Sequence, residues 1–175
     1  VLILDFGAQY SQLIARRVRE QNVYCEVKPC SISPAEIEKI APIGIILSGG
    51  PQSVYESVSL RVDPALFALG IPVLGICYGC QLMAYSLGGT VAAATEATAR
   101  EYGKTLTEFD TDCSIFQGLP ASSVTWMSHG DYISQVPDGF AVTAKTAVCP
   151  TAAMPGEEAV RRPVPSGGTA YGRRQ

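Results

Sequence analysis

The sequence is poor in residues that build metal sites. His129 is the only histidine among 175 residues, and the six cysteines contain a single C-x-x-C pair, Cys77 and Cys80. A structural zinc site needs four ligands at recognisable spacing, so we predict no metal site. The cysteines are scattered through a chain too large to need covalent cross-links, which predicts reduced thiols rather than disulfides.

Long apolar runs and an excess of positive charge are also absent. No apolar run reaches the roughly 20 residues of a membrane span, and no signal peptide precedes the first apolar stretch. The net charge of −3 leaves no basic footprint for nucleic acid or an anionic membrane. We therefore predict a cytoplasmic protein without nucleic-acid or membrane partners. An initiator methionine is missing as well, so we expect a fragment.

A hydrophobic content of 47% predicts one substantial core. Apolar runs alternate with helical patterns in the first half of the chain, which predicts an α/β fold: an open, mostly parallel, doubly wound sheet with helices on both faces. After Gly89, short alternating segments predict a small antiparallel or mixed annex. The expected strands are residues 1–5, 23–27, 43–47, 72–76, 90–92, 103–109, 123–127 and 140–145, and the expected helices are residues 11–21, 34–38 and 81–87. The first helix is expected to carry Leu13, Ile14 and Val18 on its apolar side. The second is expected to be capped by Ser33, with proline at its first position.

The stretch that organises the chain is Gly75-Ile-Cys77-Tyr-Gly79, where an apolar strand stops and a helix restarts. Glycines on both sides of a cysteine permit the strained turn of a nucleophile elbow, which presents the thiol at the carboxyl end of the strand. The helix N-terminus is expected to favour the thiolate. Two alternatives stay open: a small buried hydrophobic cysteine, or a redox C-x-x-C motif with Cys80.

A second loop ends the preceding strand at the same predicted sheet edge. Ser48-Gly-Gly50-Pro51 is by itself an ordinary turn. Beside a cysteine elbow, its double glycine would let a backbone N–H approach a developing oxyanion, together with the N–H of Tyr78.

Several motifs together resemble the class I glutamine amidotransferase domains of GMP synthases. They lie in residues 3–20, in residues 46–54, in the cysteine elbow with Gln81, in Arg100-Glu-Tyr-Gly103 and in Trp126-Met-Ser-His-Gly-Asp131. The resemblance covers residues 1–154, which we expect to form the glutamine amidotransferase domain. We interpret Trp126 as part of the core or of a pocket wall, and we assign Arg100-Glu-Tyr-Gly103 no catalytic role.

The resemblance implies a glutaminase in which Cys77 attacks L-glutamine and the N–H groups of Gly50 and Tyr78 hold the oxyanion. The positions that bind glutamine in the family match Gln81, Ser128, Gly130 and Asp131, and His129 lies beside that pocket. The family domain needs no cofactor. Its ammonia passes to an ATP-pyrophosphatase (synthetase) domain or subunit, which uses ATP and Mg²⁺ to aminate XMP to GMP and is missing from this chain.

The chain lacks the family motif Tyr-Gly-Val-Gln-Phe-His-Pro-Glu-Val, which supplies the histidine base and its glutamate partner. Plausible codons for Leu followed by this motif, read out of frame by one nucleotide, translate to Ala-Val-Arg-Arg-Pro-Val-Pro-Ser-Gly-Gly, the residues at 159–168. The hypothesis is a double frameshift, in the gene or in its sequencing. The histidine codon would then straddle Pro165 and Ser166, and the glutamate codon Gly167 and Gly168. We expect residues 155–175 to be an aberrant segment.

Without its base, Cys77 is expected to be impaired as a nucleophile. A non-catalytic module that binds glutamine or docks a partner is the alternative function. A third interpretation keeps catalysis and uses His129 as a substitute base.

Overall fold

The computed structural model describes residues 1–7, 9–57, 59–93 and 101–156. The chain divides into two compact units, Val1–Val91 and Ala92–Gln175, and each is described by itself. No helix in the described part of the chain combines the length and the apolar character that a membrane crossing requires.

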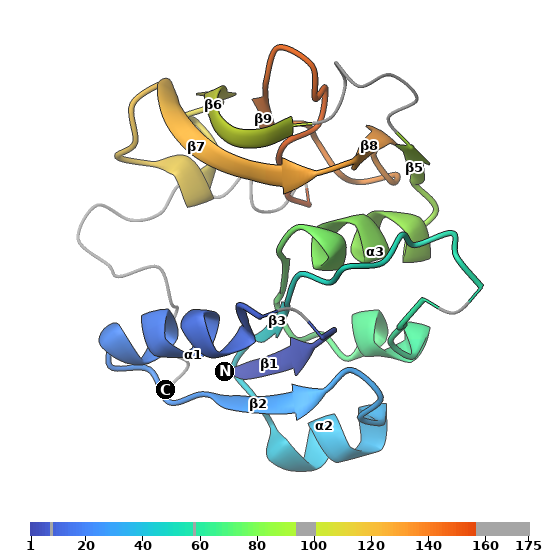
Figure 1. Cartoon of the computed structure of the whole chain (residues 1–175). Coiled ribbons are helices and arrows are strands. Elements are labelled where there is room, and N and C mark those ends of the chain that lie inside the picture. The colour runs from blue at the N-terminus through green and yellow to red at the C-terminus, as the bar shows by residue number, and fades with distance from the viewer. Residues whose placement is uncertain (8, 58, 94–100, 157–175) are drawn as a thin grey trace. The chain divides into compact units, whose positions relative to one another are not determined.

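The first unit is built on a four-stranded sheet in which every strand is parallel to its neighbours (Figure 1). The strand order is β2-β1-β3-β4. β1 is central and its side chains are almost wholly buried, which explains its unbroken apolar sequence. The bounds are β1 Leu2–Asp5, β2 Glu26–Pro29, β3 Ile45–Leu47 and β4 Val73–Gly75.

Helices lie on opposite sides of this sheet, as the doubly wound prediction requires. α1 (Ser11–Glu20) and α2 (Pro34–Ile40) stand on its two sides in Figure 1. The crossover from β1 to β2 runs toward one edge of the sheet and the crossover from β2 to β3 toward the other. Right-handed crossovers in opposite directions place their helices on opposite faces. The unit also contains the 3₁₀ helix η1 (Pro64–Ala68) and α3 (Tyr78–Ser86).

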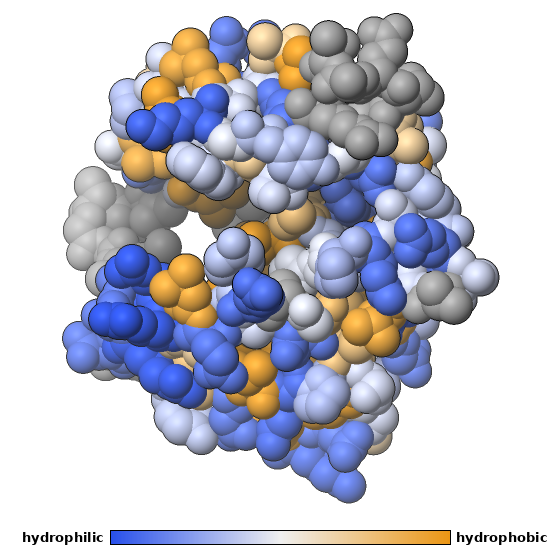
Figure 2. Space-filling view, viewed as in Figure 1, coloured by the Kyte–Doolittle hydropathy of each residue, from blue (hydrophilic) through white to orange (hydrophobic). Residues whose placement is uncertain are grey.

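α1 is anchored by small side chains rather than by the apolar row that the sequence predicts. Ala15 is fully buried in a cluster with Ile3 and Cys25, against which Ile14 and Val18 pack. Leu13, predicted for the same apolar side, is 45% exposed because it lies outside this narrow contact. Arg16 and Arg17 pair with Glu20 on the solvent side, and Figure 2 shows hydrophilic side chains gathered over α1.

α2 begins with the capping arrangement that its sequence predicts. Ser33 accepts a hydrogen bond from the backbone N–H of Glu36, and the Glu36 carboxylate accepts one from the N–H of Ser33. Proline at the first helical position supplies a preset φ and lacks only an N–H that would have no helical partner. These features fix the start of α2 at Pro34.

The second unit contains the predicted antiparallel annex. β6 (Glu101–Phe109) pairs with β7 (Ser122–His129) along most of its length, and with the short β9 (Ala144–Lys145) on its other edge. β5 (Thr90–Ala93) and β8 (Asp131–Gln135) form a two-stranded sheet. β8 and the 3₁₀ helix η3 (Ser114–Phe116) were not predicted from the sequence.

All six cysteines are free thiols in the structure.

Candidate active site

Cys77 lies at the N-cap of α3, directly after β4, with φ 53° and ψ −114°. A positive φ in a residue with a side chain is strained, at a cost of about 1–3 kcal/mol. Such strain persists only where the surrounding structure enforces it. The strand-to-helix turn predicted from the Gly-x-Cys-x-Gly pattern is therefore confirmed as geometry.

Two glycines enforce this turn because side chains at their positions would overlap the backbone. A Cβ atom at Gly75 would lie 2.6 Å from the Cα atom and the backbone nitrogen of Cys80. A Cβ atom at Gly79 would collide with the carbonyl of Leu47 and lie 2.6 Å from its Cβ atom. The first turn of α3 can approach the ends of β3 and β4 this closely only because neither glycine carries a side chain.

Backbone hydrogen bonds hold the elbow against the end of β3. The N–H of Gly79 donates to the carbonyl of Ser48 at 3.1 Å, and the N–H of Ile76 donates to the carbonyl of Leu47 at 3.0 Å. The carbonyl of Cys77 accepts from the N–H of Gln81 at 3.1 Å, which starts the helix. These bonds fix the position of the Cys77 backbone without any contribution from its thiol.

The Ser48–Gly50 loop is held from the other side by the end of β1. The fully buried Ser48 hydroxyl accepts the N–H of Phe6 at 3.2 Å and donates to the carbonyl of Gly49 at 3.0 Å. A Cβ atom at Gly50 would lie 3.2 Å from Phe6 and 3.3 Å from the Tyr78 ring. The structure thus brings together the two residues predicted to form the oxyanion hole.

Tyr78 anchors the first turn of α3 through its side chain. Its ring is 1% exposed and lies 5.4 Å from the ring of Phe6, centroid to centroid. Its hydroxyl donates to the carbonyl of Leu60. With the ring held in the core, the backbone N–H of Tyr78 is positioned beside the thiol of the preceding residue.

The Cys77 thiol is not activated by its own surroundings. The residue keeps an exposed surface, yet the protein atoms around the thiol displace solvent and raise its pKa. A hydrogen bond from the backbone of Tyr78 lowers the pKa, and this effect is smaller. The helix N-terminus thus favours the thiolate through the N–H of Tyr78, as expected, but desolvation outweighs this effect and the pKa of the thiol is raised overall.

Gln81 lies one turn along α3 from Cys77 and is only 8% exposed. Its backbone is tied to the elbow, so its side chain has a fixed origin relative to Cys77. Gln81, Gly50, Tyr78 and Cys77 all belong to the first unit, at the carboxyl ends of β3 and β4. This sheet edge is where α/β folds of this kind bind their ligands.

The remaining predicted residues gather in one turn of the second unit. Ser128 and His129 end β7, Gly130 forms the bend, and Asp131 begins β8. Ser128 is exposed, and the other three are partly buried. The turn therefore offers backbone and side-chain polar groups at a surface.

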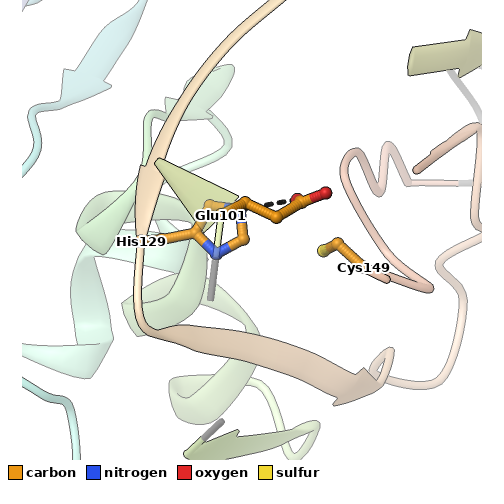
Figure 3. Close-up of side chains that lie close together, drawn as sticks. All are labelled: Glu101, His129 and Cys149. Carbon is orange, nitrogen blue, oxygen red and sulfur yellow. Dashed lines mark ion pairs between the residues drawn. The ribbon is translucent and has the colours of Figure 1, made fainter. Parts of the chain in front are cut away.

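Glu101 lies beside His129, and the sequence did not predict this contact. The two residues face each other across the β6–β7 ladder, and His129 Nε2 lies 3.3 Å from Glu101 Oε2 (Figure 3). Glu101 is part of the Arg-Glu-Tyr-Gly motif that resembles the family. This motif was the sequence signal that could have pointed to Glu101. Trp126, which the sequence assigned to the core or a pocket wall, is not a core residue: it is 73% exposed on the solvent face of β7.

The model of one protein family, described as glutamine amidotransferase class-I, matches residues 2–159. The chain belongs to the class I glutamine amidotransferase family. Segment 157–175, where the sequence places the lost His-Pro-Glu motif, lies outside the described residues.

Curated relatives of this amidotransferase chain carry the name GMP synthase [glutamine-hydrolyzing]. One from Clostridium botulinum is 54% identical over 158 residues, which covers 90% of this chain and 30% of that protein. One from Lactobacillus delbrueckii subsp. bulgaricus is 53% identical over 155 residues, covering 88% and 29%. The chain thus spans about 30% of the length of the curated relatives it matches.

Solved structures of amidotransferases share the fold. A protein from Thermoplasma acidophilum, assigned as part of a GMP synthase, is 29% identical with a TM-score of 0.79, covering 91% of this chain and 78% of that one. A glutamine amidotransferase from Thermotoga maritima, 22% identical, gives a TM-score of 0.66 and covers 85% and 68%. The predicted α/β fold class is confirmed.

Proposed function

We propose that this chain is the glutaminase part of a GMP synthase, hydrolysing L-glutamine to glutamate and ammonia through a thioester on Cys77. The observation that carries the proposal is the strained backbone of Cys77, held by two glycines that admit no side chain. A buried structural cysteine or a redox C-x-x-C motif has no need of Gly75 or of a positive φ at its first cysteine.

The reaction begins with attack of the Cys77 thiolate on the side-chain amide carbon of glutamine. The carbonyl oxygen becomes an oxyanion, which the backbone N–H groups of Gly50 and Tyr78 stabilise. Collapse of this intermediate breaks the C–N bond, and the nitrogen leaves as ammonia after taking up a proton. Water then attacks the glutamyl thioester, releasing glutamate and returning the thiol.

Substrate recognition is assigned to Gln81, Ser128, Gly130 and Asp131, as the family resemblance implies. Asp131 is suited to the substrate's α-ammonium group by charge. Since the His129 ring is directed toward Glu101, its neighbours Ser128, Gly130 and Asp131 are the better candidates for direct contact. His129 then acts by holding the turn.

The general base is the missing part of this site. Burial raises the pKa of the Cys77 thiol, so deprotonation at neutral pH needs a partner. The sequence contains one histidine, and its Nε2 faces the carboxylate of Glu101. We propose that a frameshift over residues 159–168 removed the family's histidine and glutamate and left the chain impaired. The family match ends at residue 159, where the shifted reading begins, and this supports the proposal.

The length of the relatives supports a synthetase partner. This chain corresponds to about 30% of a GMP synthase such as that of Clostridium botulinum. We propose that the ammonia is delivered to an ATP-pyrophosphatase domain or subunit, where ATP and Mg²⁺ drive amination of XMP to GMP. The glutaminase part itself is proposed to work without a cofactor in the cytoplasm.

The test uses two chains: the chain as it stands, and one in which residues 160–168 carry Tyr-Gly-Val-Gln-Phe-His-Pro-Glu-Val. Glutamine hydrolysis and labelling of Cys77 by a glutamine analogue with a diazoketone in place of the amide are measured on both. Activity and stoichiometric labelling only in the restored chain support the proposal. Equal activity in both chains contradicts the role of the lost histidine and makes His129 the first candidate base.

A second candidate function is a non-catalytic module that binds glutamine or docks a partner. The raised pKa of the Cys77 thiol favours this non-catalytic function for the chain as it stands. Saturable glutamine binding without hydrolysis or labelling would support this alternative. Sequencing the DNA across codons 155–172 decides between a mutated gene and a misread one.

A further inference from the structure

The second unit contains a cluster of three potential metal ligands that the proposed glutaminase reaction does not use as nucleophile or base. Glu101 begins β6, His129 ends β7, and Cys149 follows β9 (Figure 3). One ligand atom from each lies within 4.8 Å of the other two. The three residues are far apart in sequence, which is why motif spacing gave no sign of them.

The contact between Glu101 and His129 is long for an ion-pair hydrogen bond. Charge-assisted N–H···O bonds are about 2.7–2.9 Å long. Here Nε2 and Oε2 are 3.3 Å apart, and Oε2 has no hydrogen-bond partner among the described residues. Two ligand atoms at about 2.0–2.1 Å from a tetrahedral ion lie about 3.3–3.4 Å from each other. The spacing therefore fits two ligands of one metal ion.

Burial makes the unpartnered carboxylate oxygen costly. The side chain of Glu101 is 5% exposed and that of His129 is 15% exposed. A buried polar atom without a partner calls for an explanation, such as a bound ion or a water. The other Glu101 oxygen accepts a hydrogen bond from the Thr146 hydroxyl, which fixes the carboxylate plane and leaves Oε2 directed toward His129.

The third donor is a thiol held in the same region. Cys149 is 3% exposed, and its Sγ donates to the carbonyl of Thr151 at 3.4 Å. Its backbone N–H donates to Thr146 Oγ1 at 2.9 Å, so one hydroxyl positions both Glu101 and Cys149. A tetrahedral ion with a zinc–sulfur distance of about 2.3 Å places the sulfur about 3.5 Å from each other ligand atom, and the spacing of Sγ, within 4.8 Å of both, needs only a small inward shift to reach it.

We propose that Glu101, His129 and Cys149 bind one zinc ion, with a water as the fourth ligand. Thiolate, imidazole and carboxylate together suit zinc better than magnesium or calcium, which prefer oxygen ligands alone. The charges balance: a dication meets one carboxylate and one thiolate, and the Cys149 proton is released to solvent. The ion would link β6, β7 and the loop after β9. This proposal does not depend on glutaminase activity.

The test is a titration of the full chain with Co²⁺ under reducing conditions after removal of metals by a chelator. We expect one ion per chain, with the visible bands of tetrahedral cobalt and a near-ultraviolet thiolate-to-cobalt band. Both signals should be unchanged in the Cys77→Ser and Cys113→Ser variants. Both signals should be lost in Cys149→Ala, and the affinity for Co²⁺ should fall at least tenfold in Glu101→Gln.

X-ray absorption spectroscopy of the zinc-loaded wild-type chain tests the zinc site without variants, so a variant that fails to fold does not affect the result. One sulfur at about 2.3 Å and three nitrogen or oxygen ligands at about 2.0–2.2 Å are expected. The proposal is overturned if the folded wild-type chain gives no thiolate-to-cobalt band. It is also overturned if two sulfur ligands are found, or if the band survives in Cys149→Ala and disappears in Cys77→Ser.

Discussion

The backbone N–H of Gly79 donates a hydrogen bond to the carbonyl of Ser48 at 3.1 Å, which joins the first turn of α3 to the loop after β3. This contact connects the two loops that carry the proposed nucleophile and oxyanion hole. It requires the backbones to approach so closely that a side chain at position 79 would overlap Leu47.

We therefore expect Gly79→Ala to destabilise the chain by about 1–3 kcal/mol, because the added methyl group overpacks a rigid backbone contact. Urea unfolding gives the free energy. Gly44→Ala is the matched control, since its methyl group would meet only the carbonyl of Pro72, at 3.7 Å. It should change stability by less than about 0.5 kcal/mol. Equal effects of the two substitutions would contradict the packing argument.

The Cys77 thiol should ionise at a higher pH in the folded chain than in the unfolded one, because burial raises its pKa. The rate of alkylation by iodoacetamide follows the thiolate fraction, and mass spectrometry of the peptide containing Cys77 reports it. We expect the pH midpoint of this rate to fall when the chain is unfolded in urea. A folded-state midpoint below the unfolded one would show that the helix N-terminus dominates after all.

Thr146 should be a stability determinant of the second unit. Its hydroxyl donates to Glu101 and accepts from the backbone N–H of Cys149. Thr146→Val keeps the shape and removes these two bonds and the one that the hydroxyl accepts from the N–H of Val148. Buried polar groups are then left without partners, at a cost of about 1–3 kcal/mol. Thr146→Ser keeps the hydroxyl and should cost clearly less. Thermal unfolding of both variants measures the difference, and equal losses would assign the effect to the methyl group.

The start of α2 should show a measurable pH dependence. The Ser33 side chain, followed by its backbone N–H, lowers the pKa of Glu36. A lowered folded-state pKa means that the contribution to stability is present above the unfolded pKa and is lost as pH falls through the folded one. In Ser33→Ala the pKa of Glu36 should rise toward its ordinary value, as followed by NMR of the carboxyl carbon.

Loss of the Ser33 cap should also cost about 1 kcal/mol of stability at neutral pH. Ser33→Thr, which retains the hydroxyl, is the control and should preserve both the low pKa and the stability. An unchanged Glu36 titration in Ser33→Ala would mean that another group holds the carboxylate.

The parts of the fold that could be predicted are those whose cause lies in adjacent residues. The apolar run of β1, the capping box of α2 and the glycine-flanked turn at Cys77 each depend on a few neighbours in the chain. The burial pattern of α1 was only partly predictable, because a narrow contact at Ala15 replaced the broader face that included Leu13.

Contacts between segments that are far apart in the sequence could not be predicted. The contact of Glu101 with His129 depends on the register of β6 and β7, and Cys149 joins them through a loop tied to Thr146. No local pattern encodes such a meeting of three segments. Likewise, the pKa of Cys77 depends on desolvation by surrounding atoms, which a sequence motif does not report.

The elbow around Cys77 is held by backbone hydrogen bonds, by glycines that leave no room for a side chain and by the buried ring of Tyr78. Its geometry therefore does not rely on whichever group removes the thiol proton. Under the proposed glutaminase mechanism, loss of the base would therefore leave the position of the Cys77 thiol unchanged.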